Sequence, residues 1–176
     1  MENINESTIF TRRSIRSFIK EKKVEYEKVD ILLHAAMQAP SACNKQPWEF
    51  LVLDDEKIID SIAPIDKHYV LAAKAPLVII VLGNEKTTYR GDNGLAWYPQ
   101  DLSASIQNIL LQAAELGLGS VWIGTYPDEK RINGLKKHFN MPEHITPFAV
   151  IAIGYSEEKH KFVDRYDSSK VHYNQY

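Results

Sequence analysis

The longest regular pattern of apolar positions covers residues 95–116 and predicts the main helix of the chain. From residue 102 to residue 116, Glu115 is the only charged side chain, and apolar residues cover most of the circumference. A helix of this kind is expected to be buried on both sides. One polar stripe needs hydrogen-bond partners there, and it consists of Asp101, Ser105, Asn108, Gln112 and Glu115. Gly117 is a suitable C-terminal stop.

Shorter segments with a helical period lie on both sides of this helix. Residues 25–39 carry an apolar face and end before Pro40, which cannot continue a helix. Asp128 is the expected cap of a helix that ends at residue 139. Further short helices are expected over residues 56–62, just before Pro76, and from a cap at Asn5 or Ser7 to about residue 13.

Four short runs of aliphatic and aromatic residues predict strands, at residues 48–53, 77–82, 120–124 and 148–153. Polar turn formers at residues 84–94 predict a mobile loop. The strands and the five or six helices do not alternate strictly along the chain. This order favours an α+β fold over a doubly wound parallel sheet.

The C-terminal tail, from about residue 156 to residue 176, is charged first and then aromatic. Its aromatic residues are Phe162, Tyr166, Tyr173 and Tyr176. These side chains are too apolar for a segment that is only solvated, and no element of the same chain is an obvious partner for them. A second copy of the chain is therefore the expected partner of the tail.

Length and charge narrow the possible classes of protein. A chain of 176 residues is expected to form one domain, here residues 1–176. With 21 basic and 23 acidic residues the formal net charge is −2, so no basic excess indicates a nucleic acid or an anionic membrane as partner. The placement of charge is more informative, because three of the six arginines fall within five residues.

Cysteine and histidine usage excludes several kinds of site. Cys43 is the only cysteine, so neither an internal disulfide nor a multi-cysteine zinc site can form. The six histidines form no closely spaced pair, and no metal site is expected. Residues 1–10 lack the pattern of a secretory signal, and the longest aliphatic run is too short to span a membrane. These features predict a soluble, cytoplasmic protein.

The arginine cluster is the first candidate for chemistry, and it reads Arg12-Arg13-Ser14-Ile15-Arg16. Guanidinium groups offer a planar fork of donors that suits phosphate. In extended backbone Arg12, Ser14 and Arg16 project to one side, so these side chains could converge on one anion. An exposed basic turn that pairs with carboxylates is an equally open interpretation.

The loop between Pro40 and Trp48 is the second candidate, because its serine and amide side chains can bond both donors and acceptors of a heterocycle. Taken by itself, the loop is better explained as a helix-to-strand connector. Cys43 lies in this loop, but no histidine is placed to activate it as a nucleophile.

The glycine-rich segment at residues 117–124 is the third candidate. It is not a dinucleotide fingerprint, since Trp122 occupies the third glycine position and the segment precedes a strand instead of following one. It is not a nucleophile elbow either, because Leu118 and Trp122 flank Ser120 where glycines are needed. Glycines here allow the backbone to approach a flat ligand closely.

In this order, the three segments resemble the FMN-dependent nitroreductase family in its shorter forms. The resemblance adds the run from Asp101 to Asn108, and Ile153-Gly154-Tyr155 with Arg165 beyond it, and it covers about residues 8–173. It implies an α+β sandwich with a mainly antiparallel central sheet flanked by helices. It also implies a homodimer, formed through the long central helix, whose two FMN clefts are built from both chains.

The resemblance also implies roles for particular residues. Arg12, Arg13, Ser14 and Arg16 would hold the phosphate and ribityl end of FMN, with Arg165 joining from the tail. The other chain would contribute ring contacts, and the flavin's reactive nitrogen would lie near Ile123 and the backbone N–H of Gly124. The ring contacts from the other chain would be Pro40, Ser41, Ala42 and Asn44. Larger members often carry a glutamate at the Gly124 position, and residues 61–76 match poorly, so no role follows for Lys67 or His68.

The activity implied is a ping-pong reaction in which NADH or NADPH reduces FMN, and a nitroaromatic, quinone or related acceptor is then reduced in the same cleft. No side chain is assigned as catalytic. Other reactions of the same family, reductive dehalogenation or flavin destruction, stay open. So do a flavin-binding sensor or carrier without turnover and an anion-binding module that uses the arginines alone.

Overall fold

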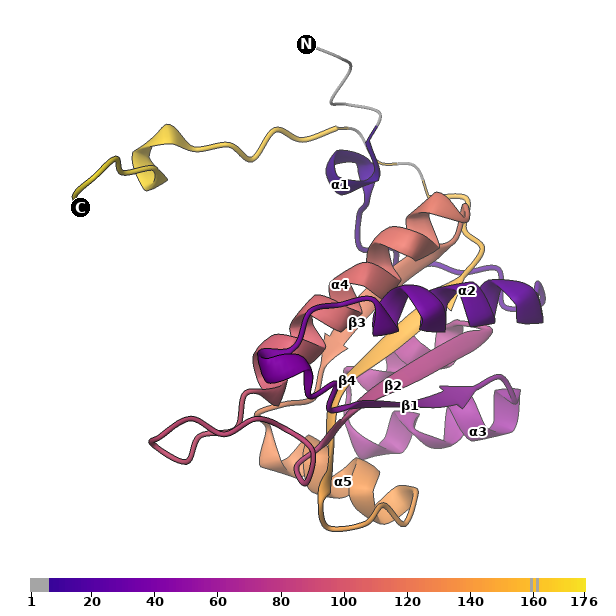
Figure 1. Cartoon of the computed structure of the whole chain (residues 1–176). Coiled ribbons are helices and arrows are strands. Elements are labelled where there is room, and N and C mark those ends of the chain that lie inside the picture. The colour runs from indigo at the N-terminus through magenta and orange to yellow at the C-terminus, as the bar shows by residue number, and fades with distance from the viewer. Residues whose placement is uncertain (1–6, 159, 161) are drawn as a thin grey trace.

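A four-stranded antiparallel sheet forms the centre of the computed structural model, which describes residues 7–158, 160 and 162–176 (Figure 1). The strand order is β1-β2-β4-β3. The strands are β1 Trp48–Leu53, β2 Leu77–Asn84, β3 Gly119–Gly124 and β4 Ile145–Gly154. All three pairings are antiparallel. The α+β class predicted from the sequence is confirmed.

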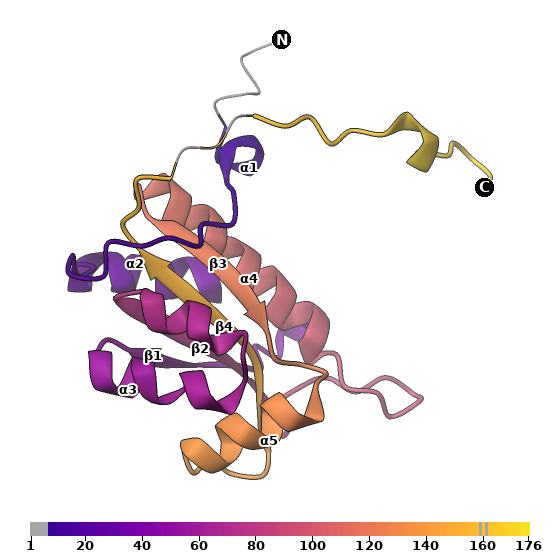
Figure 2. The same ribbon diagram turned by 180° about the vertical axis from the view of Figure 1, so that it is seen from behind.

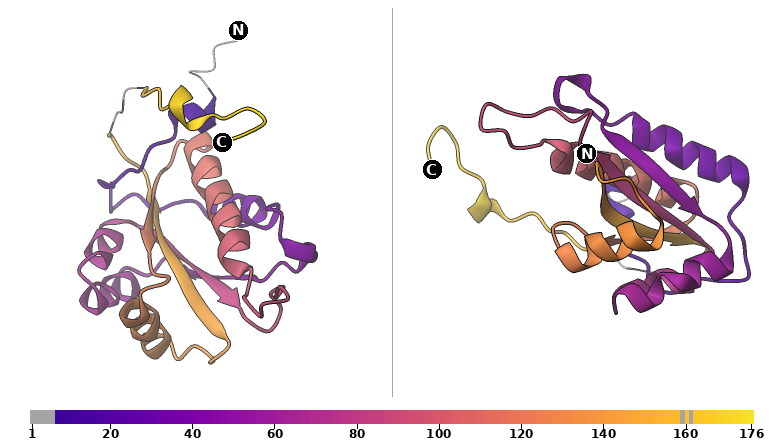
Figure 3. Two further views of the ribbon diagram at one scale, coloured as in Figure 1. Left: turned by 90° about the vertical axis from the view of Figure 1, so that its left-hand side faces the viewer. Right: turned by 90° about the horizontal axis from the view of Figure 1, so that it is seen from below.

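Helices cover both faces of this sheet, which explains why β2 reads as one continuous apolar run. Figure 3 shows the three layers edge-on. Side chains such as Ile79 and Ile151 pack toward α2 (Tyr26–Met37) and α4 (Tyr98–Glu115). Their neighbours in sequence point to the opposite layer, which Figure 2 brings to the front. That layer contains α3 Glu56–Ser61, η3 Ala63–Ile65, η4 Tyr69–Lys74 and α5 Glu129–His138.

Helix α4 begins three residues later than the apolar pattern predicts. Residues 95–97 belong instead to a hairpin-like excursion, in which Trp97 N–H donates to the Tyr89 carbonyl and Gly91 N–H donates to the Leu95 carbonyl, at 3.0 and 3.1 Å. Pro99 then occupies the first turn of the helix, where its missing N–H costs no bond. The polar turn region that follows β2 is thus a hydrogen-bonded excursion.

Strand β4 begins at Ile145, three residues before the predicted start. Pro147 lies inside the strand and pairs with Leu82, at a register shift between Val81 and Leu82. Proline has no N–H for the ladder and is tolerated in a sheet at such a bulge. Because proline is rare inside strands, the sequence pattern predicts a later start for β4 than the structure shows.

The N-terminal arginine segment runs extended beside the start of β3. α1 (Thr8–Thr11) precedes it, with Ser7 at the N-cap position, while the alternative cap, Asn5, lies outside the described residues. Ile15 N–H donates to the Ser120 carbonyl at 3.0 Å, and Ser14 forms a parallel bridge with Ser120. A Cβ at Gly119 would lie 2.6 Å from Ile15 Cγ2, so only glycine allows this close packing.

The C-terminal tail extends away from the body of the chain (Figure 1). Tyr166 and Tyr173 are 73% and 81% exposed, and among the tail residues that the structure describes the one regular element is η5 Ser168–Lys170. Within the described part of the chain, no helix is long and apolar enough to cross a membrane.

The first testable prediction concerns the middle of the sheet. Replacing the fully buried Ile151 by alanine should lower the free energy of unfolding by about 2–5 kcal/mol, because it leaves a cavity between β4 and the α2/α4 layer. Leu95→Ala is the control, since Leu95 is 65% exposed and its change should stay within about 0.5 kcal/mol. Urea unfolding followed by circular dichroism measures both, and equal effects would contradict this packing.

Candidate functional site

A basic pocket of about 450 Å³, called here the β3 pocket, opens at the end of β3. Its described lining residues are Arg16, Lys67, His68, Val70, Leu71, Lys74, Val121, Trp122, Ile123, Gly124 and Arg131. Four of them are cationic and none is acidic. A Cβ added at Gly124 would meet no described atom within 4 Å, so the backbone at this glycine faces open space. A flat, electron-rich or anionic ligand fits such a pocket.

A second pocket of about 340 Å³, the arginine pocket, lies between α1 and the tail. Its described lining residues are Ile9, Phe10, Arg12, Arg13, Val163, Asp164, Arg165 and Tyr166. Burial lowers the pKa of Arg12, and the charges of Arg13 and Arg165 lower it further. The Arg12 Nε is buried and has no hydrogen-bond partner among the described residues. A buried donor beside two like charges indicates that an anion belongs here.

The two pockets are joined by the extended arginine segment. Arg12 lines the arginine pocket and Arg16 lines the β3 pocket, with Ser14 between them. Four residues of extended chain span roughly 13 Å. Arg12 and Arg16 thus line different pockets of the single chain, and the expectation that Arg12, Ser14 and Arg16 converge on one anion stays a prediction.

The polar loop after α2 lies in a different place from Ile123 and Gly124. It contains η2 (Ala42–Asn44) and sits at the N-terminal end of α4, where the Asp101 Oδ1 accepts the Ala42 N–H at 2.9 Å. The β3 pocket is on the other side of the sheet, since Val121 and Ile123 pack in the α3/α5 layer. Among the described residues that line the β3 pocket or the arginine pocket, none belongs to residues 40–47.

Backbone strain is concentrated in this loop. Cys43, Asn44 and Gln46 have φ values of 50°, 51° and 48°, in the left-handed region that ordinary side chains avoid. The Ser41 hydroxyl accepts the Gln46 N–H at 2.9 Å and helps to hold the turn. Such strain persists where the surrounding structure enforces it, and it is common at functional sites.

Asp101 is the buried anchor of the loop. It is 4% exposed, and burial raises its pKa although the Ala42 N–H lowers it. Three members of the predicted polar stripe thus have partners inside the chain. Asp101 holds the loop, the Asn108 amide donates to the Ala35 carbonyl at 3.0 Å, and the Glu115 carboxylate accepts from the Thr8 hydroxyl.

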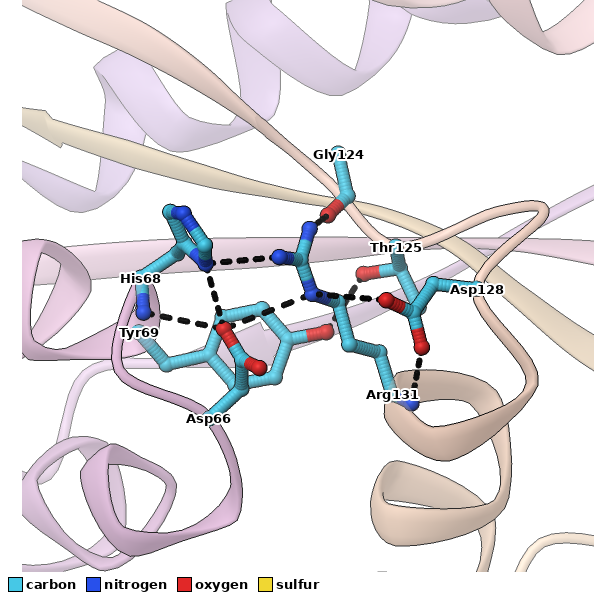
Figure 4. Close-up of polar contacts among 7 residues, drawn as sticks. All are labelled: Asp66, His68, Tyr69, Gly124, Thr125, Asp128 and Arg131. Atoms are coloured by element: carbon cyan, nitrogen blue, oxygen red, sulfur yellow. Dashed lines mark hydrogen bonds and ion pairs between the residues drawn. The ribbon is translucent and has the colours of Figure 1, made fainter.

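A charged cluster that the sequence patterns do not predict surrounds Arg131 (Figure 4). The Arg131 Nη1 donates to the Gly124 carbonyl at 2.8 Å, and its Nε forms ion pairs with Asp66 and Asp128 at 3.3 and 3.5 Å. His68 Nδ1 lies 2.6 Å from both Asp66 Oδ1 and Arg131 Nη2. Only one signal could have found the cluster, namely that Arg131 is one of just six arginines.

Comparison with known proteins identifies the family to which the chain belongs. The sequence profile described as "Nitroreductase family" matches residues 9–70 and 66–155, most of the chain. The chain belongs to the nitroreductase family. The resemblance stated from the sequence motifs, and the nitroreductase-like sandwich that it implies, are thereby confirmed.

Three similar proteins show how far the similarity extends. A Methanothermobacter thermautotrophicus protein, provisionally named NADH dehydrogenase/NAD(P)H nitroreductase, is 38% identical over 93% of this chain and 83% of its own length. A provisionally named NADH oxidase from Clostridium acetobutylicum has a solved structure with a TM-score of 0.89, 44% identity and coverage of 97% and 100%. A Desulfovibrio desulfuricans protein, provisionally called a nitroreductase, was solved in complex with FMN; its TM-score is 0.81, its identity 28% and its coverage 100% and 99%.

The second prediction concerns the pH dependence of stability. The His68 backbone N–H and the positive charge of Arg131 lower the pKa of Asp66 to about 2. Asp66→Asn should therefore destabilise the protein by about 1–2 kcal/mol at pH 7, because hydrogen bonds to a carboxylate are lost. Since the native pKa lies below the unfolded one, the gap between wild type and variant should be complete above about pH 4 and close as the pH falls toward 2.

Urea unfolding at several pH values tests this prediction. Asp54→Asn is the matched control, because Asp54 is exposed and its substitution should change stability by less than about 0.5 kcal/mol. A gap between wild type and Asp66→Asn that stayed constant down to pH 2 would contradict the assigned role of Asp66.

Proposed function

We propose that this nitroreductase-family chain is an FMN-dependent oxidoreductase. It takes electrons from NADH or NADPH and passes them to nitroaromatic, quinone or related acceptors by a ping-pong mechanism. The observation that carries the proposal is the buried, unpartnered Arg12 Nε in a pocket of three arginines, joined by extended chain to a pocket open at Gly124. FMN carries an anionic phosphate and a flat ring at about the separation that this extended segment spans.

The residues present fit this cofactor. Arg12, Arg13 and Arg165 would bind the phosphate in the arginine pocket, where their charges otherwise repel one another. Ser14 and Arg16 would follow the ribityl chain along the extended segment. Ile123 and Gly124 would lie against the ring in the β3 pocket. FMN, when bound, supplies the hydride chemistry, and the protein binds, orients and tunes it.

The protein's own contribution to the reaction is electrostatic. The Gly124 backbone N–H and the cationic side chains of the β3 pocket would stabilise negative charge that develops on the ligand. No nucleophilic side chain is needed for this role. The relative from Methanothermobacter supports NADH or NADPH as donor through its name, and the Desulfovibrio complex supports FMN as cofactor.

Two chains would be needed to complete each site. Residues 40–47 lie on the other side of the sheet from Gly124, so Pro40, Ser41, Ala42 and Asn44 would line the flavin of a partner chain. The outward face of α4 is half-buried or exposed, with small or uncharged side chains, and would form the contact. Its members are Gln100, Ser103, Ala104, Gln107, Leu111 and Ala114. The exposed tyrosines of the tail would wrap that partner.

The third prediction tests the anion site. Arg12→Ala and Arg16→Ala should each raise the FMN dissociation constant about 10- to 100-fold, since each removes a charge-assisted hydrogen bond. Arg90→Ala is a matched control, because Arg90 lies on the exposed excursion after β2, and it should leave FMN binding unchanged. Quenching of FMN fluorescence on titration with protein measures all four constants.

Several results would reject parts of the proposal. A purified wild type that is colourless and takes up no added FMN would reject it entirely. A yellow protein that NADH or NADPH cannot bleach without oxygen would reject the reaction. A flavin that is bleached by the donor but reoxidised by no acceptor in a panel of quinones and nitroaromatics would indicate a sensor or carrier.

The fourth prediction tests the dimer. Ala104→Glu places a charge on the outward face of α4 and should convert dimers to monomers. Bound FMN should then be lost, because each flavin pocket would lack the residues that the partner chain supplies. Ile58→Glu is the control, since Ile58 is an exposed apolar residue on α3, away from this face. Sedimentation equilibrium with absorbance at flavin wavelengths follows mass and cofactor together, and a wild-type monomer that binds FMN fully would contradict the shared site.

A further inference from the structure

The end of β3 is held in place from several directions, and Arg131 provides the contact at the pocket. The peptide between Gly124 and Thr125 has its carbonyl bound by Arg131 Nη1 at 2.8 Å and its N–H bound by the Phe148 carbonyl at 3.2 Å. The Thr125 hydroxyl pairs with the Tyr69 hydroxyl at 2.7 Å in the buried layer beneath. The orientation of this peptide is therefore determined at both ends.

Arg131 is itself fixed by carboxylates that come from two elements. Asp66 precedes η4, and Asp128 caps α5 by accepting the Arg131 backbone N–H at 3.1 Å. The Arg131 Nε lies between these two carboxylates, and its side chain is only 19% exposed. Because Asp66 has a pKa of about 2, it is ionised near neutral pH, where FMN binding would be measured.

His68 supplies a further anchor, as Figure 4 shows. Its Nδ1 is 2.6 Å from Arg131 Nη2 and 2.6 Å from Asp66 Oδ1, and one ring nitrogen cannot accept and donate at the same time. With the ring proton on Nε2, Nδ1 accepts from Arg131. The Nη1 and Nη2 atoms are then hydrogen-bonded to Gly124 and His68, while the Nε makes no hydrogen bond among the described residues and is held there only by its ion pairs with the two carboxylates.

We propose that Arg131 is a positioning residue for the flavin pocket, which holds the Gly124–Thr125 peptide so that the open side of Gly124 faces the ring. This assignment rests on the proposed function. A peptide freed from Arg131 could rotate and turn its carbonyl oxygen, the negative end of its dipole, into the β3 pocket. That oxygen would repel an electron-rich ligand and oppose the gain of negative charge there.

The geometry distinguishes two possible roles of Arg131: holding the Gly124–Thr125 peptide in position, and supplying positive charge. A lysine at residue 131 keeps the positive charge but has a single ammonium group, which cannot bind Gly124, His68 and the two carboxylates together. If Arg131 acts by position, Arg131→Lys and Arg131→Gln fail alike. If only its charge matters, Arg131→Lys behaves as the wild type.

The test begins with flavin-free protein, so that it has a readout independent of turnover. Hydrogen exchange of the Thr125 amide, followed by NMR, should become at least about tenfold faster in Arg131→Lys and Arg131→Gln, because the peptide loses its carbonyl partner. Asp66→Asn, which weakens the hold on Arg131 without touching Gly124, should give a smaller increase. Lys137→Gln, on the exposed side of the same helix, is the control and should match the wild type.

The same variants are then loaded with FMN. Both Arg131 variants should bind FMN about tenfold more weakly than the wild type and give it a more negative midpoint potential, while their melting temperatures show that they remain folded. Wild-type exchange at Thr125 together with unchanged FMN affinity and potential would overturn the assignment, as would full rescue by lysine. Wild-type protein that binds no FMN would instead overturn the proposed function, and this assignment with it.

Discussion

The hydrogen bond from Ile15 N–H to the Ser120 carbonyl aligns the N-terminal segment with β3, and the geometry of the candidate site depends on this alignment. It is possible because Gly119 has no side chain where Ile15 packs. Once the segment is held extended, Arg12 and Arg16 lie at the two ends of a stretch of chain that spans roughly 13 Å, and each lines a different pocket. The same strand ends at Gly124, so one short stretch of β3 sets the position of both the arginine pocket and the β3 pocket.

The arginine pocket carries an excess of positive charge, and this excess suits it to bind an anion. The charges of Arg13 and Arg165 lie close to Arg12, and burial also opposes the charge of Arg12, an arrangement that an anion stabilises. In the β3 pocket the opposite holds for Arg131, whose charge is neutralised by Asp66 and Asp128. The first group is suited to bind a ligand, whereas Arg131 is suited to hold the protein's own backbone.

The separation of the loop from Gly124 has a physical origin in the layered fold. A sheet covered on both faces separates the elements of its two layers, and residues 40–47 follow α2 on the face opposite the β3 pocket. A single chain therefore presents a strained, amide-rich loop in one place and a basic pocket in another. Association of two chains is the arrangement that would bring the two features together.

Local patterns in the sequence determined the secondary structure, because the period of apolar residues and the caps act over a few residues. The four strands, the main helix and the Asp128 cap were predictable, as were the arginine segment and the glycines of β3. The early start of β4 was not, because Pro147 is accommodated only by a bulge against β2.

Contacts between distant segments were decided by the tertiary structure alone. The division of Arg12 and Arg16 between two pockets depends on pairing with β3. The cluster of Asp66, His68 and Arg131 joins residues 65 positions apart in the sequence, none of which carries a local signal for the others. Local preferences determine elements, but the charges that meet at Gly124 do so only because the packing of η4 and α5 on the sheet brings them there.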